Sequence, residues 1–240
     1  MKKQSFKIDY IVSILLILFL STSLFSCGND EPKSSIPATQ NVYVGSHFNI
    51  GDDGNWVSSN KFVATVEDGF VKGVHVGECV ISNGKQICII TVIPTSHFIE
   101  EPTIEWGISK DQIISKYGDD YTSSREIIGY LTNYPETTPL VMFGFINNWL
   151  SASAILVSTK YTDQMVDFLI ERYQPIKMDG YDSYFVNGYT PESTTLAIKV
   201  SLLNDDYWNV IYVPYSSSRL SSEYIDHEDL FGLIHQINGL

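Results

Sequence analysis

Three cysteines are the residues of this sequence whose chemistry is easiest to interpret. Cys27 follows the apolar run IVSILLILFL at 11–20 and precedes the acidic stretch GNDEP. Cys79 and Cys88 flank Asn83-Gly84, a dipeptide typical of tight hairpin turns. A cysteine can be oxidised to a disulfide, bind a metal or carry a lipid, and the surrounding sequence decides among these roles.

The second and third cysteines fit a cross-strand disulfide. A two-residue turn centred on Asn83-Gly84 pairs Cys79 directly with Cys88 at a non-hydrogen-bonded position, where the Cα atoms are close enough for a bridge. An exported chain meets an oxidising compartment, so we expect this disulfide, with a stabilisation of about 2–3 kcal/mol. Two buried free thiols are the alternative. We expect no metal site, because the hairpin offers no further ligands.

Other catalytic or metal-binding signals are weak. The sequence lacks G-x-S-x-G, H-E-x-x-H, P-loop and G-x-G-x-x-G motifs, and no carboxylate pair stands out as an acid and a base. His227 and His235 could share one helix face, but a solvated polar face is the better interpretation. The segments at 50–55 and 117–121 contain Gly-Asp-Asp without the ligand spacing of a calcium loop, so we interpret them as turns. We therefore expect no enzyme, no catalytic residues, no cofactor and no metal.

The tryptophans give the remaining candidate binding residues. Trp56 is expected in a core. Trp149 and Trp208 each follow a predicted tight turn, so we expect matched core positions for both. The alternative is an exposed platform for a sugar or peptide, since an aromatic ring provides a large flat contact surface.

Charge excludes one class of partner. The 240-residue chain has a formal net charge of −13, which becomes −15 if residues 1–26 are removed with their three lysines and one aspartate. Such a surface repels phosphate backbones, so nucleic-acid binding is not expected.

The N-terminus has the pattern of a secretory signal. Lys2, Lys3 and Lys7 precede the apolar run, which is shorter than the roughly 20 residues of a spanning helix. The tetrapeptide Leu24-Phe25-Ser26-Cys27 resembles the lipobox of bacterial lipoproteins, although Phe25 is bulkier than usual. This resemblance implies removal of residues 1–26, lipidation of Cys27 and anchoring in the outer membrane. The acids after Cys27 resemble a surface-export signal, but inner-leaflet and surface positions both remain open. An uncleaved signal anchor is the alternative to the lipoprotein.

Residues 27–39 are polar and contain prolines, which predicts a flexible tether. Residues 40–94 alternate in the manner of β-strands. They also contain a pattern of aromatic, small polar, apolar and glycine residues: Trp56, Ser58, Ser59, Asn60, Val63, Ala64, Val66, Gly69, Val71, Gly73, Gly77 and Ile81. In this pattern the segment resembles the bacterial Ig-like domain, group 2, which implies a short all-β sandwich.

Residues 101–240 predict an α+β domain with an internal duplication. Helical patterns at 109–118 and 161–173, capped by Ser109 and Thr162, are each followed by three strand-like runs. The repeats span about 103–157 and 158–214; chance similarity is the alternative. The predicted strands lie at 125–131, 140–146, 151–157, 182–188, 195–203 and 208–215.

Residues 105–120 weakly resemble the helix opening of β-lactamase-inhibitor-like outer-membrane lipoproteins. The resemblance implies an antiparallel sheet with helices packed on one face. At the C-terminus, about 222–238, an apolar stripe predicts a helix docked on the sheet. Its apolar residues are Ile225, Leu230, Leu233, Ile234 and Ile237.

Together these patterns predict a non-catalytic envelope lipoprotein. Its Ig-like part is a spacer or adhesion module, and its α+β domain binds a polysaccharide or a protein. An envelope-assembly or inhibitor-type lipoprotein acting through a protein interface is the second hypothesis. A hydrolase without a recognisable motif is a weaker third.

Overall fold

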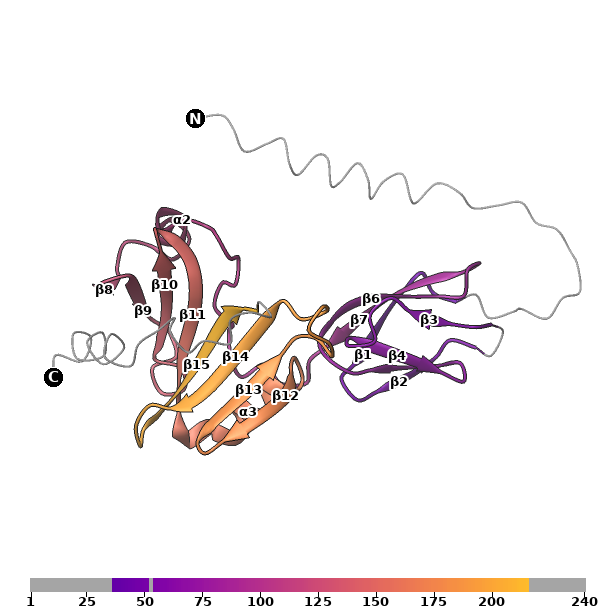
Figure 1. Ribbon diagram of the computed structural model, residues 1–240. Coiled ribbons are helices and arrows are strands. Elements are labelled where there is room, and N and C mark those ends of the chain that lie inside the picture. The colour runs from indigo at the N-terminus through magenta and orange to yellow at the C-terminus, as the bar shows by residue number, and fades with distance from the viewer. Residues whose placement is uncertain (1–35, 52–53, 216–240) are drawn as a thin grey trace, which may run out of the picture. The chain divides into compact units, whose positions relative to one another are not determined.

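The computed structural model describes residues 36–51 and 54–215. These residues form mostly β-structure, with strands in three sheets and two short α-helices (Figure 1). The predicted β-rich fold is confirmed at this level. In the described ranges, no helix is long and apolar enough to cross a membrane. The predicted signal peptide, Cys27, most of the tether and the predicted C-terminal helix lie outside the described residues.

Two small sheets form the N-terminal part of the described chain. The four-stranded sheet has the order β1-β7-β6-β3, with β1 parallel to β7, and the three-stranded sheet has the antiparallel order β2-β5-β4. Their strands are β1 (Thr39–Tyr43), β2 (His47–Asn49), β3 (Val57–Ser58), β4 (Ala64–Glu67), β5 (Phe70–Gly73), β6 (Gly77–Ser82) and β7 (Ile87–Ile93).

Both small sheets contribute to one apolar core. Val71 of β5 and Ile90 of β7 are fully buried in it, and Trp56 lies beside them with 9% of its surface exposed. The Trp56 Nε1 donates a hydrogen bond to the Gly51 carbonyl at 3.1 Å, so the polar end of the buried indole is paired. The core position predicted for Trp56 is confirmed.

The hairpin between β6 and β7 has a longer loop than its sequence predicts. Ser82 pairs with Ile87, which leaves four residues in the loop. The Asn83 Oδ1 accepts hydrogen bonds from the backbone N–H groups of Lys85 at 3.0 Å and Gln86 at 2.8 Å. This side chain therefore stabilises the wider turn, an alternative that the Asn-Gly dipeptide alone does not reveal.

The longer loop shifts the strand register and separates the two cysteines. Cys79 lies opposite Ile90, and Cys88 lies opposite Ile81, so the predicted pairing of Cys79 with Cys88 is wrong. The cysteines are diagonal neighbours on one face, where Cα atoms are typically about 7–8 Å apart, beyond the usual range of a disulfide. Both are buried free thiols in this structure, and burial raises the pKa of each.

The second half of the chain forms one antiparallel sheet of eight strands, in the order β12-β13-β14-β15-β11-β10-β9-β8. Strands β8 and β12 form its edges. Within β12, the pairing shifts between Pro175 and Lys177, which marks a bulge. The strands of the eight-stranded sheet are β8 (Thr122–Ser124), β9 (Ile127–Leu131), β10 (Leu140–Ile146), β11 (Trp149–Ser158), β12 (Gln174–Asp179), β13 (Asp182–Val186), β14 (Leu196–Leu202) and β15 (Tyr207–Pro214).

The two halves of this sheet have the same order of elements. Helix α2 (Lys110–Tyr117) precedes the meander β8–β11, and helix α3 (Thr162–Ile170) precedes the meander β12–β15. The last strands of the two meanders, β11 and β15, pair antiparallel at the centre of the sheet. Each half thus has four strands, where the sequence pattern predicted three; β8 and β12 were missed. The duplication itself stays a prediction.

The two helices begin differently. Ser109 caps α2 as predicted, and its side chain and that of Gln112 bond reciprocally to each other's backbone N–H groups. The predicted cap of α3 at Thr162 is wrong, because a 3-10 turn, η1 (Thr159–Tyr161), leads directly into the helix. The Thr162 hydroxyl instead donates to the Thr159 carbonyl at 2.7 Å.

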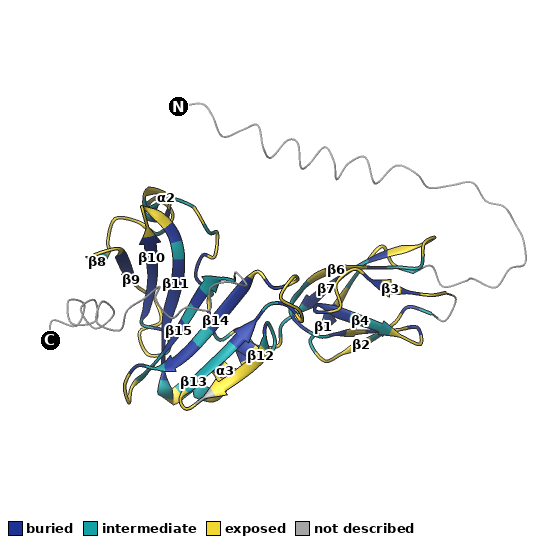
Figure 2. Ribbon diagram, viewed as in Figure 1, coloured by how far each residue is buried: buried dark blue, intermediate teal, exposed yellow. Residues whose placement is uncertain are grey.

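Both helices lie on the same face of the sheet, here called the first face. Ile113 of α2 and Phe168 of α3 are buried in one core with Phe143, Ile155 and Tyr212 from the strands. Figure 2 shows the buried residues concentrated along β10, β11 and β14. A separate apolar cluster lies on the opposite face, here called the second face. Its buried members are Ile127, Leu140, Met142, Ala152, Ala154, Leu156 and Leu203, with Tyr207, Ile211 and Val213 packed against them.

The observed register predicts that Cys79 and Cys88 are both free thiols. We expect Cys79 and Cys88 both to react with a thiol reagent after denaturation without reductant, and neither to react quickly in the native protein, because both are buried. Peptide mass spectrometry of the modified chain measures each site separately. Recovery of a Cys79–Cys88 disulfide-linked peptide from the unreduced protein would contradict the observed pairing.

Candidate functional site

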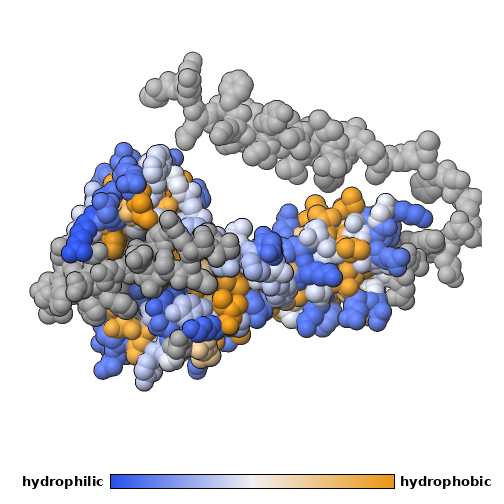
Figure 3. Space-filling model, in the orientation of Figure 1, coloured by the Kyte–Doolittle hydropathy of each residue, from blue (hydrophilic) through white to orange (hydrophobic). Residues whose placement is uncertain are grey.

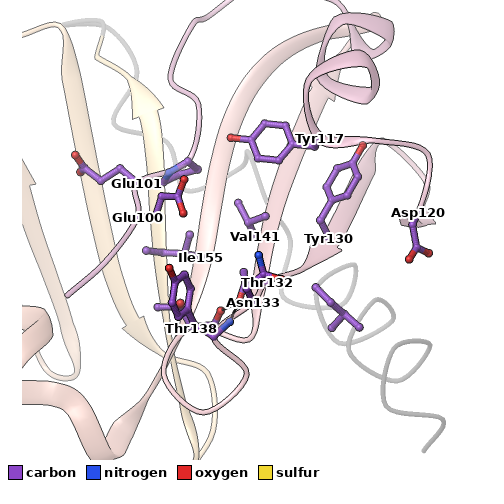
Figure 4. Close-up of a pocket in the computed structure, with 13 residues that line it drawn as sticks. Glu100, Glu101, Tyr117, Asp120, Tyr130, Thr132, Asn133, Thr138, Val141 and Ile155 are labelled. Atoms are coloured by element: carbon purple, nitrogen blue, oxygen red, sulfur yellow. Dashed lines mark hydrogen bonds between the residues drawn. The ribbon is translucent and has the colours of Figure 1, made fainter. Parts of the chain in front are cut away.

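A pocket of about 370 Å³ lies on the eight-stranded sheet, within the size range of small-molecule sites. Helix α2, three neighbouring strands and the segments before α2 and after β9 form its walls (Figure 4). The lining residues are Glu100, Glu101, Pro102, Tyr117, Asp120, Tyr130, Leu131, Thr132, Asn133, Tyr134, Thr138, Val141 and Ile155.

Two tyrosines form a fixed aromatic wall. The rings of Tyr117, at the end of α2, and Tyr130, in β9, have centroids 5.5 Å apart, and Tyr117 also packs on Phe143 at 4.7 Å. The Tyr117 hydroxyl accepts from the Thr103 N–H at 3.2 Å, and the Tyr130 hydroxyl donates to the Gly118 carbonyl at 3.0 Å. Both rings are therefore held in place before any ligand arrives.

The Tyr130 hydroxyl remains protonated at neutral pH. Burial, followed by the nearby Tyr121, Asp119 and Tyr117, raises the pKa of Tyr130 to about 12. A neutral phenol is both a donor and an acceptor, so this wall carries no charge of its own.

The loop between β9 and β10 supplies polar groups on another side of the pocket. The Thr132 hydroxyl donates to the Thr138 carbonyl and accepts from the Tyr134 N–H, the latter at 3.0 Å. The Thr137 and Thr138 N–H groups donate to the Tyr134 carbonyl at 3.1 and 2.9 Å. These bonds order the loop backbone, while the Tyr134 residue stays 56% exposed.

Three carboxylates give the pocket a negative character. Glu100 and Glu101 lie on one side, and Asp120 lies beyond Tyr130 (Figure 4). None of the lining residues is a lysine or an arginine. Neutral or cationic ligands are therefore favoured over anionic ones.

Glu101 also connects the pocket to the core. Its carboxylate accepts a hydrogen bond from the Tyr173 hydroxyl at 2.6 Å and lies 3.9 Å from the Arg172 Nε. Burial raises the pKa of Glu101 above its ordinary value, although Tyr173 and Arg172 act in the opposite direction. Burial and this carboxylate also raise the pKa values of Tyr173 and of the fully buried Tyr212.

Arg172 is held by neighbours other than Glu101. Its guanidinium lies 3.6 Å from the centre of the Phe168 ring, and it donates to the carbonyls of Phe168 and Ser96, each at 3.1 Å. The adjacent Glu171 accepts from the N–H groups of Thr95 at 3.0 Å and Ser96 at 2.9 Å. Burial would raise the pKa of Glu171, but these hydrogen bonds and the charge of Arg172 together lower it. The segment before the pocket is thereby fixed to the end of α3.

The structure does not bring Trp149 and Trp208 together. Trp149 is the first residue of β11 and is 54% exposed, so the core position expected for it is wrong. Trp208 lies opposite Val157, packs against the first-face core and donates from Nε1 to the Thr162 hydroxyl at 2.8 Å. Eight residues of β11 separate the two positions, or roughly 25 Å. A shared aromatic platform is excluded by this arrangement.

The histidines show no common site among the described residues. His75 is buried and stacks on Phe62 at 4.0 Å, with its Nδ1 2.8 Å from the Phe62 carbonyl oxygen. Burial lowers the pKa of His75. In residues 36–51 and 54–215, no group of three or more His, Cys, Asp and Glu residues is placed to hold a metal ion. His227 and His235 lie outside the described residues.

Sequence reasoning missed the pocket because its residues come from distant segments. Glu100 and Glu101 lie where the predicted α+β part begins, outside any predicted helix or strand, and Tyr117 and Asp120 belong to a segment interpreted as a turn. Only the density of tyrosines near 117–134 hinted at an aromatic site. Their convergence depends on the pairing of β9, β10 and β11, which local patterns do not specify.

The raised pKa of Glu101 leads to a pH dependence. A carboxyl whose pKa is raised on folding stabilises the protein below its unfolded pKa, near 4.5, and this stability is lost as the pH rises through the folded value. The substitution Glu101→Gln removes this pH-dependent loss of stability, because glutamine does not ionise. We therefore expect the unfolding free energy of Glu101→Gln, relative to wild type, to increase between pH 4 and pH 7, by about 1 kcal/mol or less because the side chain is 32% exposed. Urea denaturation measures it, with Glu100→Gln as the control for loss of one charge. A decrease over the same range would contradict the assignment.

Comparisons with known proteins identify no family for this chain. No protein-family model matches it, and no curated protein matches it. Among solved structures, an extracellular protein containing an SCP domain from Bacillus anthracis str. Ames is similar, with 14% sequence identity and a TM-score of 0.25. The similarity covers 62% of this chain and 66% of that one, slightly under two thirds of its length. At this level it supports no statement about fold or function.

Proposed function

We propose that this protein is a non-catalytic lipoprotein of the bacterial outer membrane whose eight-stranded domain binds a carbohydrate. The pocket beside Tyr117 and Tyr130 is the binding site. The N-terminal sheets act as a spacer between the membrane and this domain, a role implied by their sequence resemblance to bacterial Ig-like domains.

The N-terminal sequence supports the anchor. A lysine-bearing start, an apolar run and the tetrapeptide ending in Cys27 together match a lipoprotein signal. The negative charge of the chain opposes electrostatic binding to anionic lipid, so attached acyl chains are the better source of membrane affinity.

The main support for carbohydrate binding is the residue composition of the pocket. Flat aromatic rings suit the apolar faces of sugar rings. Carboxylates accept hydrogen bonds from sugar hydroxyls, and side-chain hydroxyls and an amide can both accept and donate them. Tyr117 and the 56% exposed Tyr134 supply ring surface, while Tyr130, which is 5% exposed, packs against Tyr117. The polar groups come from Glu100, Thr132 and Asn133. The volume of about 370 Å³ fits one or two sugar units rather than a long chain.

The charge of the pocket restricts the class of sugar further. Three carboxylates and no cation line the pocket, so an acidic sugar would place its own carboxylate among like charges. Neutral sugars and amino sugars fit the site better.

A protein partner is a second candidate function. On the outer face of the four-stranded sheet, Ile87 is 64% exposed, Val57 is 58% exposed and Val80 is 36% exposed. Their strands pair so that all three side chains share one face. Figure 3 shows apolar side chains gathered over this part of the chain. An exposed apolar patch of this kind favours contact with another protein.

The anchor is tested at the modified residue. We expect Cys27→Ala to abolish incorporation of a labelled fatty acid and to leave residues 1–26 uncleaved, because the thiol is the acceptor of the lipid. Mass spectrometry of the purified chain measures both. Unchanged acyl labelling of Cys27→Ala would remove the proposed anchor but leave the pocket untouched.

The binding site is tested with an exposed pocket residue. We expect Tyr134→Ala to weaken binding of a neutral or amino sugar by about fivefold, because an aromatic contact is worth about 1 kcal/mol. A glycan array identifies the sugar, and calorimetry measures the affinity. Tyr181→Ala is the matched control, because Tyr181 is 75% exposed and does not line the pocket.

Two outcomes would contradict the proposed site. One is equal loss of affinity in Tyr134→Ala and Tyr181→Ala. The other is a preference for acidic sugars over neutral ones. Absence of any glycan ligand, together with loss of envelope-protein capture in Ile87→Asp, would favour the protein partner instead.

A further inference from the structure

The second face of the eight-stranded sheet is apolar, and among the described residues only the sheet and its turns contribute to it. The cluster on this face has members from β9, β10, β11 and β15 and from the β14–β15 turn, but none from α2 or α3. In contrast, the first face is covered by both helices. A sheet of this composition needs a covering layer on each side to be stable in water.

The middle of this face is fully buried. Met142, Ala152 and Ala154 each have 0% of their surface exposed, although two of these side chains are a single methyl group. Among the described residues, no helix contributes a side chain to this cluster, and burial this complete is what a face with a further layer over it would show.

We propose that the C-terminal segment, residues 216–240, covers the second face as an amphipathic helix. Leu230, Leu233, Ile234 and Ile237 have the i, i+3, i+4, i+7 spacing of one helix face, so together they present a continuous apolar stripe. On an ideal helix, Glu228 and His235 fall on the opposite side.

Chain connectivity allows residues 216–240 to reach the second face of the eight-stranded sheet. Strand β15 ends at Pro214, and β11 and β10 are its next two neighbours on that side, about 10 Å away. Residues 215–229 provide fifteen residues before the stripe, enough to reach roughly 50 Å when extended. The segment can therefore return across β15 onto the cluster without strain.

Two polar side chains on this face argue against a lipid surface as its cover. Ser201 and Asn209 lie directly opposite each other on β14 and β15, and Asn209 also lies opposite Leu156 of the cluster. Both are almost fully buried, and neither the Ser201 Oγ nor the Asn209 Oδ1 has a hydrogen-bond partner among the described residues. A hydrocarbon layer offers no donor to such atoms, whereas a peptide segment offers backbone and side-chain donors.

The test measures access to the second face in the full chain. Ala154→Cys places a reporter thiol within the cluster, and peptide mass spectrometry distinguishes it from the other cysteines. We expect slow modification of this thiol in the otherwise unaltered chain. Adding Leu233→Asp, which puts a charge in the apolar stripe, should accelerate modification by on the order of 100-fold, because the reporter reacts only when the segment is detached. Adding Gln236→Asp, which puts the same charge outside the stripe, should leave the rate unchanged.

A second measurement keeps the test decisive if Leu233→Asp disturbs folding. Hydrogen exchange on the unaltered chain should show protected amides between residues 230 and 237. Exchange there at unfolded-peptide rates would overturn the proposal, and so would equal reporter rates in Leu233→Asp and Gln236→Asp. Slow modification that appears only at high protein concentration would instead identify a second copy of the chain as the cover.

Discussion

The pairing of β11 with β15 is the constraint on which the eight-stranded sheet depends. Each of these strands ends one four-stranded meander, and six consecutive residue pairs, from Ser153 with Tyr212 to Ser158 with Tyr207, join the meanders into one sheet. The pairing of β11 with β15 also determines which side chains of the two strands share each face of the sheet. Val157 and Val210 point to the helix-covered core, while Ala154 and Leu156 point to the opposite side. The pocket adjoins the same seam, because Ile155 of β11 is one of its lining residues and lies opposite Val210 of β15.

Local sequence patterns predicted those elements whose signals are also local. The capped helix after Ser109 and the strand at 140–146 were found because a cap and a hydrophobic run are readable within a few residues. Strand β12 was missed because it contains Pro175 and lies at an edge, where its exposed residues show no clean alternation. The register of the two cysteines was also predicted wrongly. The Asn83 side chain accepts hydrogen bonds that stabilise a four-residue turn. This longer turn shifts the pairing of every residue of β6 with β7.

The candidate site was less predictable than the fold. Glu101 has no recognisable motif, yet contacts with Tyr173 and Arg172, more than seventy residues later in the chain, determine its protonation behaviour. Tyr117 and Tyr130 meet only after a helix and two strands have packed. Residues that converge through tertiary packing carry no spacing rule, whereas Trp149 and Trp208, which did follow a rule, lie far apart. The two tryptophans were matched because each follows a turn in its predicted repeat, but Trp149 is exposed at the start of β11 whereas Trp208 of β15 packs against the first-face core.

The bulge in β12 has a consequence for how copies of this protein coexist at high density. A long, regular open strand edge is a template on which the edge of another molecule can pair, and such pairing leads to aggregation. Here Pro175 removes one backbone donor, and the register shift that follows breaks the regular row of hydrogen-bonding groups. At the other margin, β8 is only three residues long. Neither border of the eight-stranded sheet offers a long regular row of hydrogen-bonding groups, which disfavours edge-to-edge polymerisation through this sheet.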